Sequence, residues 1–164
     1  MHSLLSEHRM YYQQGKHDLA VEFFKQAIDI NPHLVEAHGL LGDVYYEQGK
    51  YDRAIEPYKR VIAINPNFGA PYYLKQGHAY YHLGRYDQAI ESIKKTIDIH
   101  PHSVDAYFML GKIYHNQARY DRAIELYNKT LDVHSNNLAN DWGGTLNISK
   151  VQQLINSATS RQDF

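Results

Sequence analysis

Residues 42–55 read GDVYYEQGKYDRAI, and closely similar stretches follow as GHAYYHLGRYDQAI at residues 77–90 and as GKIYHNQARYDRAI at residues 111–124. The period is therefore about 34 residues. A period of this length is typical of a solenoid, in which one repeat is too small to bury its own apolar face and stacks on its neighbours. The sequence predicts a repeat array.

The repeats share one framework of residue types. Residues 35–68 carry His38-x2-Leu41-Gly42-x2-Tyr45, then Ala54-x3-Tyr58 and Pro66. Residues 104–137 carry Tyr107-x2-Leu110-Gly111-x2-Tyr114, then Ala123-x3-Tyr127. This pattern resembles that of the tetratricopeptide repeat, which runs Trp-x2-Leu-Gly-x2-Tyr, Ala-x3-Phe and Pro over 34 residues.

The resemblance implies an all-α fold, a right-handed α-solenoid of antiparallel helix pairs, here named helix A and helix B of each repeat. It divides residues 1–137 into four repeats, at 1–34, 35–68, 69–103 and 104–137. Within a repeat we expect the helix A glycine, such as Gly42, to face the helix B alanine, such as Ala54, so that the two backbones approach closely.

Local signals mark the ends of the helices. Aspartates stand where helix B needs an N-cap, a role that this side chain fills well: Asp18, Asp52, Asp87 and Asp121. Glycines serve the tight turn before helix B: Gly15, Gly49 and Gly84. Prolines end helix B, because its interior does not tolerate them: Pro32, Pro66 and Pro101. The fourth repeat has Ser135 instead of a proline.

The third repeat, 69–103, holds one residue more than its neighbours. We expect a longer loop within residues 67–71, with Pro71 opening the helix. The alternative is a one-residue π-bulge near Lys75 and Gln76, a feature often found at functional sites.

Residues 138–164 lose the repeat pattern. Trp142-Gly143-Gly144 marks a break, and helical periodicity resumes over about 145–158 with one apolar stripe of Val151, Leu154, Ile155 and Ala158. Thr145 or Asn147 could cap this helix. We expect it to cover the exposed end of the solenoid; alternatively it folds into the groove or onto a second copy. Residues from Ser157 to Phe164 are expected to fray.

Composition excludes several classes of function. The net charge is −1, which leaves no broad basic field for nucleic acid. No apolar run approaches the roughly 20 residues of a membrane span, and the N-terminus has no signal-peptide pattern. Cysteine is absent, so disulfides and thiol catalysis are excluded, and a cytoplasmic location is weakly favoured. Tyrosine (15) and histidine (11) are unusually frequent.

In the family that the sequence resembles, helix A lines a concave groove where ligands bind. Counting from the glycine of each repeat places one tyrosine-rich row and one row of alternating charge in that groove. Tyrosine is enriched at binding hot spots. The predicted peptide-binding residues are Arg9, Tyr12, Asp43, Tyr46, Leu74, His78, Tyr81, His82, Phe108, Lys112 and His115.

Two more specific functions can be tested on the residues. The carboxylate clamp of chaperone-binding family members needs lysine, asparagine and arginine where this chain has Leu5, Arg9, Leu40, Pro71 and Lys75. Chaperone-tail binding is therefore not expected. His78 and His82 share a helix face with the spacing of a zinc pair, and His115 could join them. We interpret these histidines as polar groove residues and predict no metal and no cofactor.

We find no nucleophile with a base, no phosphate loop and no catalytic pair of carboxylates, so the chain is not expected to be an enzyme. The leading hypothesis is a protein–protein interaction module or scaffold that holds a peptide segment of a partner protein in the concave groove. The alternative is a self-assembling scaffold, a homo-oligomer, or the repeat region of a larger protein or enzyme.

Overall fold

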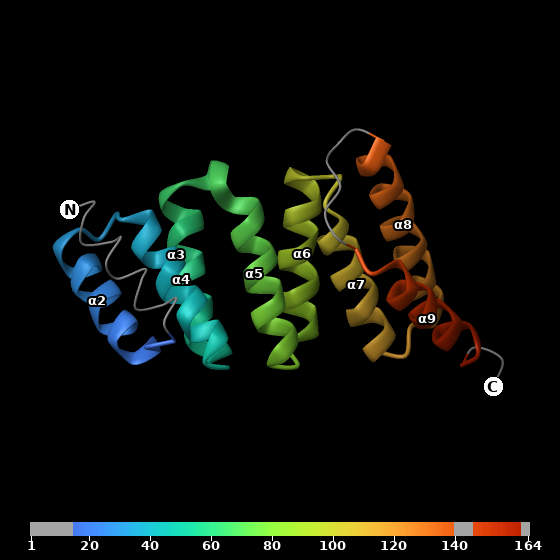
Figure 1. Cartoon of the computed structure of the whole chain (residues 1–164), viewed down its shortest axis with the longest axis horizontal. Helices are drawn as coiled ribbons and strands as arrows, with labels where there is room; N and C mark the ends of the chain where they lie inside the picture. The colour runs from blue at the N-terminus through green and yellow to red at the C-terminus, as the bar shows by residue number, and fades with distance from the viewer. Residues whose placement is uncertain (1–14, 140–145, 162–164) are drawn as a thin grey trace. The chain divides into compact units, whose positions relative to one another are not determined.

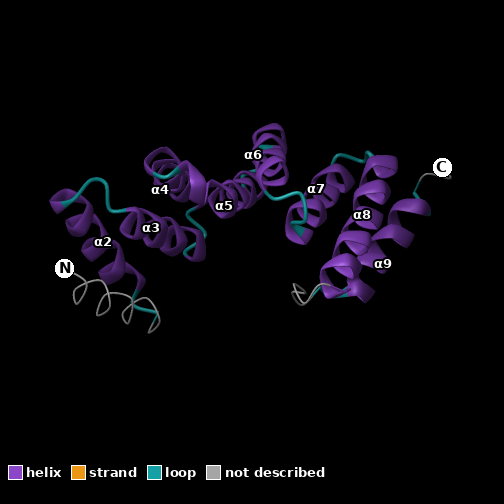
Figure 2. Ribbon diagram, turned by 90° about the horizontal axis from the view of Figure 1, so that it is seen from above, coloured by secondary structure: helices purple, strands orange, loops and turns teal. Residues whose placement is uncertain are grey.

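A computed structural model describes residues 15–139 and 146–161 of the chain. Within these ranges every regular element is a helix, and no strand occurs (Figures 1 and 2). The elements are α2 His17–Ile30, α3 Val35–Glu47, α4 Tyr51–Ile64, the 3₁₀ turn η1 Pro66–Phe68, α5 Gly69–His82, α6 Tyr86–Ile99, α7 Val104–Asn116, α8 Tyr120–Ala139 and α9 Ile148–Thr159. The predicted all-α helical repeat fold is confirmed.

The chain forms two compact units. Unit 1 spans Met1–Arg85 and unit 2 spans Tyr86–Phe164. The boundary falls in the turn between α5 and α6, so the two helices predicted for the third repeat belong to different units. Each unit is therefore described by itself. In unit 1, α2 packs on α3, α3 on α4 and α4 on α5; in unit 2, α6 packs on α7, α7 on α8 and α8 on α9.

Aromatic side chains fill the centre of each unit. In unit 1, Phe24 of α2 and Tyr58 of α4 are almost fully buried together with Val44 and Tyr45 of α3. In unit 2, Tyr127 of α8 is fully buried. Burial of an aromatic ring contributes several kcal/mol, about 3–5 by the cost of its removal. These rings hold the helix pairs together.

The helix A glycines make room for these rings. A Cβ added to Gly111 would lie 2.7 Å from both Cδ1 and Cε1 of Tyr127, and one added to Gly42 would clash with the ring of Tyr58. The atoms nearest to a Cβ at Gly42 belong to Tyr58, one helical turn beyond Ala54, and the expectation that Gly42 faces Ala54 stays a prediction. The absence of a side chain at the glycine accommodates the ring.

The turn from helix A to helix B is a Schellman motif in both units. After α3, the Gly49 amide donates to Tyr46 O and the Lys50 amide donates to Tyr45 O, at 2.9 Å each. Gly49 has a φ of +71°, as the motif requires, and Gly15 and Gly84 have φ values of +71° and +69°. The predicted role of these glycines is confirmed. In the fourth repeat Ala118 takes this position, with a φ of +57°.

Replacing Ala118 by glycine is expected to stabilise unit 2 by about 0.5–1 kcal/mol. A left-handed conformation costs a residue with a Cβ about 1–2 kcal/mol, and glycine avoids this cost. Glycine also makes the unfolded chain more flexible, which offsets roughly 0.5–1 kcal/mol of the stabilisation. Urea unfolding followed by circular dichroism measures the change. Gly49→Ala is the matched control and should destabilise unit 1. A destabilised Ala118→Gly protein would contradict this account.

The aspartate N-caps predicted for helix B are wrong. The N-cap of α2 is Lys16 and that of α4 is Lys50, neither with a side-chain cap, and Asp18 and Asp52 lie inside the first turn. Asp87 and Asp121 occupy the same place in α6 and α8. A carboxylate in the first turn still stabilises the helix through the positive end of the helix dipole. The aspartates therefore mark the start of helix B, but Asp18 and Asp52 each lie two residues after the N-cap.

The prolines end helix B as predicted, since α2, α4 and α6 each end two residues before one. Where Ser135 replaces the proline, α8 runs on to Ala139. The extra residue of the third repeat does not lengthen the loop: α5 begins at Gly69, and Pro71 is its third residue. α5 therefore has 14 residues against 13 in α3, and it is α-helical throughout, without a π-bulge.

The C-terminal helix α9 forms as the apolar stripe predicts. The Asn147 side chain caps it by accepting from the Lys150 amide at 2.9 Å. Val151, Ile155 and Ala158 are buried, and α9 packs on α8. The prediction that the chain frays from Ser157 is wrong up to Thr159, where α9 ends, since Ala158 is fully buried. The predicted break at Trp142–Gly144 and the last three residues lie outside the described residues.

Candidate binding surface

An ion pair joins the helices of unit 1. Lys75 Nζ of α5 lies 2.7 and 2.8 Å from the two carboxylate oxygens of Asp43 on α3. Tyr58 of α4 donates its hydroxyl to Asp43 Oδ1 at 2.9 Å. The side chains of Lys75 and Asp43 are 40% and 24% exposed, so the pair is accessible from solvent. We call these three residues the Asp43 network.

Tyr72 of α5 lies beside the network. Lys75 Nζ is 5.3 Å from the centre of the Tyr72 ring, a cation–π distance. Burial raises the pKa of the Tyr72 phenol, and the negative charges of Asp43 and Glu36 raise it further. The phenol therefore stays protonated and remains a hydrogen-bond donor. The Tyr72 hydroxyl also occupies the space over Gly39, where a Cβ would clash with it.

An aromatic cluster lies further along the same helices. Tyr51 of α4 stacks on His82 of α5, with ring centres 4.3 Å apart and planes 9° apart. Tyr46 of α3 meets both rings edge-on, at 5.1 and 5.7 Å, and Tyr81 meets His82 edge-on at 5.6 Å. Burial, and next to it Tyr51, raises the pKa of Tyr46. Tyr46, Tyr51 and Tyr81 are half-buried and His82 is exposed. These four residues are called the aromatic cluster.

The structure brings some of the predicted groove residues together. Asp43, Tyr46, Tyr81 and His82 belong to the Asp43 network or the aromatic cluster. Leu74 and His78 lie on α5 and are half-buried. Arg9 and Tyr12 lie outside the described residues. Within unit 1 the predicted surface is thus built on α3 and α5.

The predicted groove residues of the fourth repeat lie near the C-terminal helix. Phe108 of α7 packs against the core that Tyr127 forms with Val151 and Ile155 of α9. Burial lowers the pKa of Lys112, and Lys150 of α9 lowers it further. Burial and then Arg161 likewise lower the pKa of His115. This face of unit 2 therefore lies close to α9, a neighbour that the repeat pattern does not predict.

Four residues of this candidate surface were not among the predicted groove residues. Lys75, Tyr51, Tyr58 and Tyr72 lie at positions that the groove rows do not include. A signal existed for Lys75, since it is a cation on the helix A that follows Asp43. No group of three metal-ligating side chains lies close together among the residues that the structure describes. His82 instead stacks on Tyr51, and His115 lies edge-on to Tyr120 at 5.5 Å.

The family of this chain follows from the family models that match its sequence. Two family models, both described as tetratricopeptide repeat, match residues 11–79 and 74–137. The chain is a tetratricopeptide repeat protein. The two matches together cover all the repeats after the first ten residues. No curated protein matches the sequence.

Solved structures share the fold of this chain. The crystal structure of MamA protein is 24% identical, with a TM-score of 0.75 over 98% of this chain and 90% of that chain. A second MamA crystal structure is 22% identical, with a TM-score of 0.72 over 95% and 94%. The first TPR of Spaghetti (RPAP3), bound to the HSP90 peptide SRMEEVD, is 22% identical, with a TM-score of 0.65 over 71% and 91%.

Tetratricopeptide repeats form a protein-interaction fold, so the chain is a protein-interaction module. In the described part of the chain, no helix has the length and apolar character needed to cross a lipid bilayer.

Proposed function

We propose that unit 1 binds a peptide segment of a partner protein on the surface formed by the Asp43 network and the aromatic cluster. The observation that carries the proposal is the cluster itself. Three half-buried tyrosines and an exposed histidine form one continuous aromatic surface beside an accessible ion pair. Tyrosine rings give contact area at little entropic cost and a hydroxyl for hydrogen bonding, which is why they form binding hot spots.

The charges favour a peptide that carries both signs. Lys75 and Asp43 are paired with each other at 2.7 Å, so neither supplies an isolated charge. A ligand that contacts this pair gains most by presenting one acidic and one basic group to its two ends. The Spaghetti repeat domain holds a peptide from HSP90. This chain has Leu40 and Pro71 at two positions where the carboxylate clamp of chaperone-binding family members needs a polar or basic residue. The proposed ligand is therefore a peptide of a different kind.

The test is a Tyr46→Ala, Tyr81→Ala double variant. Partners captured by the wild-type protein are identified by mass spectrometry, and the affinity of the mapped peptide is then measured by calorimetry. Loss of two hot-spot rings should weaken binding at least about 10-fold, since each 1.4 kcal/mol is a factor of ten. The matched control is Tyr73→Ala, a half-buried tyrosine of α5 outside the cluster.

An unchanged affinity in a variant that still folds would reject the proposed surface. Sedimentation velocity over a range of concentrations accompanies the experiment, because it separates binding of another protein from self-association. A captured partner that proves to be a second copy of the chain would support the self-assembling scaffold instead.

A further inference from the structure

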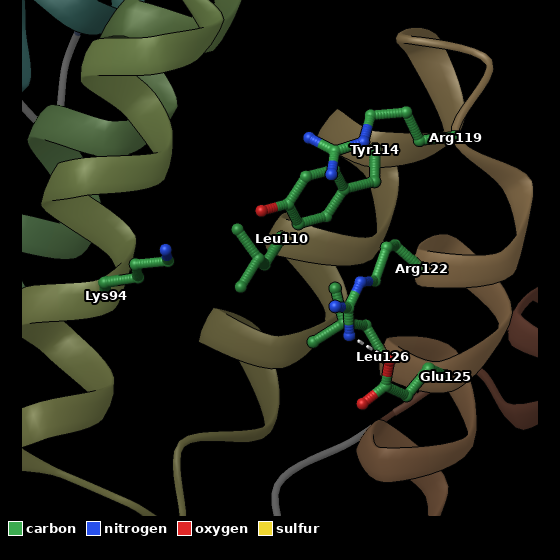
Figure 3. Close-up of a pocket in the computed structure, with 7 residues that line it drawn as sticks. All are labelled: Lys94, Leu110, Tyr114, Arg119, Arg122, Glu125 and Leu126. Atoms are coloured by element: carbon green, nitrogen blue, oxygen red, sulfur yellow. Dashed lines mark hydrogen bonds and ion pairs between the residues drawn. The ribbon is translucent and has the colours of Figure 1, made fainter.

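A cavity of about 300 Å³ opens in unit 2 among α6, α7 and the first turns of α8 (Figure 3). Lys94 reaches toward it from α6, and Arg119, Arg122 and Glu125 reach toward it from the start of α8 and the turn before it. All its residues belong to unit 2 and none belongs to the surface proposed above. An inference about this cavity therefore does not depend on the proposed function.

The cavity has an excess of positive charge. Three cations and one carboxylate give a local charge of +2, whereas the whole chain has a net charge of −1. Arg122 is paired with Glu125 at 2.8 Å. For Lys94 and Arg119, no acidic partner is found among the residues that the structure describes. The positive charge that remains is contributed by these two side chains.

Arg119 packs on an aromatic ring of α7. Its guanidinium carbon lies 4.7 Å from the centre of the Tyr114 ring, and Figure 3 shows the guanidinium beside that ring. A guanidinium stacked on an aromatic face keeps its N–H groups directed outward at its edges, where they can bind a carboxylate with two hydrogen bonds. Tyr114 and Leu126 are half-buried and supply an apolar wall beside this edge.

Repeat 2 has the same signs of charge at the equivalent positions but a different arrangement. Lys50, Arg53 and Glu56 correspond in sequence to Arg119, Arg122 and Glu125. In unit 1, however, Glu56 pairs with Arg60 at 3.3 Å. The tyrosine equivalent to Tyr114 is Tyr45, which is only 7% exposed and belongs to the core. The fourth repeat therefore differs from repeat 2 in having a partly exposed Tyr114 with Arg119 over its ring. The repeat pattern does not predict this arrangement.

We propose that this cavity binds a glutamate or aspartate side chain from an acidic segment of a partner protein, with the carboxylate between Arg119 and Lys94. Charge complementarity selects the class of partner. Glu125 already pairs with Arg122, so an incoming carboxylate meets Lys94 and Arg119. The neighbouring side chain of the segment lies on Leu126 and Tyr114.

The probe is a fluorescein-labelled octapeptide of alternating glutamate and alanine, compared by fluorescence anisotropy at low salt with the same peptide carrying glutamine for glutamate. We expect the glutamate peptide to bind and the glutamine peptide to bind at least about 10-fold more weakly. Lys94→Gln and Arg119→Gln should each weaken binding of the glutamate peptide about fivefold or more.

The matched controls are Lys95→Gln on α6 and Lys129→Gln on α8. Both remove the same charge from an exposed lysine outside the cavity, and each should change the affinity less than about twofold. Equal losses in the control and cavity variants would mean diffuse electrostatic attraction and would overturn the proposal. Equal binding of the glutamine peptide would overturn it as well. A phosphoserine version of the peptide that binds about 10-fold more tightly would overturn the carboxylate assignment and assign the cavity to phosphate.

Discussion

Replacing Tyr127 by alanine is expected to destabilise unit 2 by about 3–5 kcal/mol, the cost of removing a fully buried aromatic ring. Tyr127 is 0% exposed and packs with Ala123 of its own helix and with Val151 and Ile155 of α9. Its ring also fills the space above Gly111 of α7. One side chain therefore contacts three helices, and its loss leaves a cavity that none of them can close alone. Urea unfolding monitored by circular dichroism gives the change.

Tyr120→Ala is the control for this prediction. Tyr120 lies on the same helix, is half-buried, and contacts the edge of His115 at 5.5 Å. Its removal should cost about 1 kcal/mol, within the usual range for point substitutions. If the two variants lost the same stability, the ring of Tyr127 would not be the centre of the α7–α8–α9 packing.

The pairing of Gly111 with Tyr127 shows what the sequence could predict. Among the described residues, the 34-residue period identified the helices, their order and the C-terminal ends of α2, α4 and α6, because glycine, proline and apolar spacing act locally. Which atom fills the space at a glycine depends on the ring of a residue on another helix. The expectation that Gly42 faces Ala54 did not include Tyr58, whose ring supplies the atoms nearest to a Cβ at Gly42.

The site was harder to predict than the fold. The repeat pattern predicts that Tyr46 and His82 lie on one surface, because they occupy groove positions on successive A helices. Their rings do meet in the structure. Counting along the repeats assumed that every repeat presents an equal surface. It could not show that Phe108 packs against a core cluster that includes residues of α9, or that Tyr51, from a B helix, stacks on His82. These contacts depend on tertiary packing and side-chain orientation, which a periodic pattern does not encode.

The prediction of aspartate N-caps for helix B was wrong for a simpler reason. Asp18 and Asp52 lie two residues after the observed N-caps, and both positions are compatible with the same sequence pattern. A first-turn carboxylate and an N-cap carboxylate both stabilise the start of a helix, the first through the helix dipole and the second through a hydrogen bond. Residue type alone does not separate them.

Val151→Asp is expected to destabilise unit 2 by several kcal/mol, about 4, and to release α9 from α8. Val151 is 0% exposed and lies in the core cluster with Tyr127 and Ile155. A carboxylate at that position would be buried without a partner, which proteins tolerate only at a cost of several kcal/mol. Helix α9 can avoid the cost by detaching. Limited proteolysis detects the released helix, and urea unfolding gives the loss of stability.

Gln152→Asp introduces the same charge one residue further along α9, at an exposed position. It should change the stability by no more than about 0.5 kcal/mol. Together the two variants distinguish the possible roles of α9. A helix that caps its own chain should be lost from a monomer in Val151→Asp, whereas a helix exchanged between copies should lower the oligomeric state in the same variant. Sedimentation velocity separates the two outcomes, and an intact, stable Val151→Asp protein would contradict both.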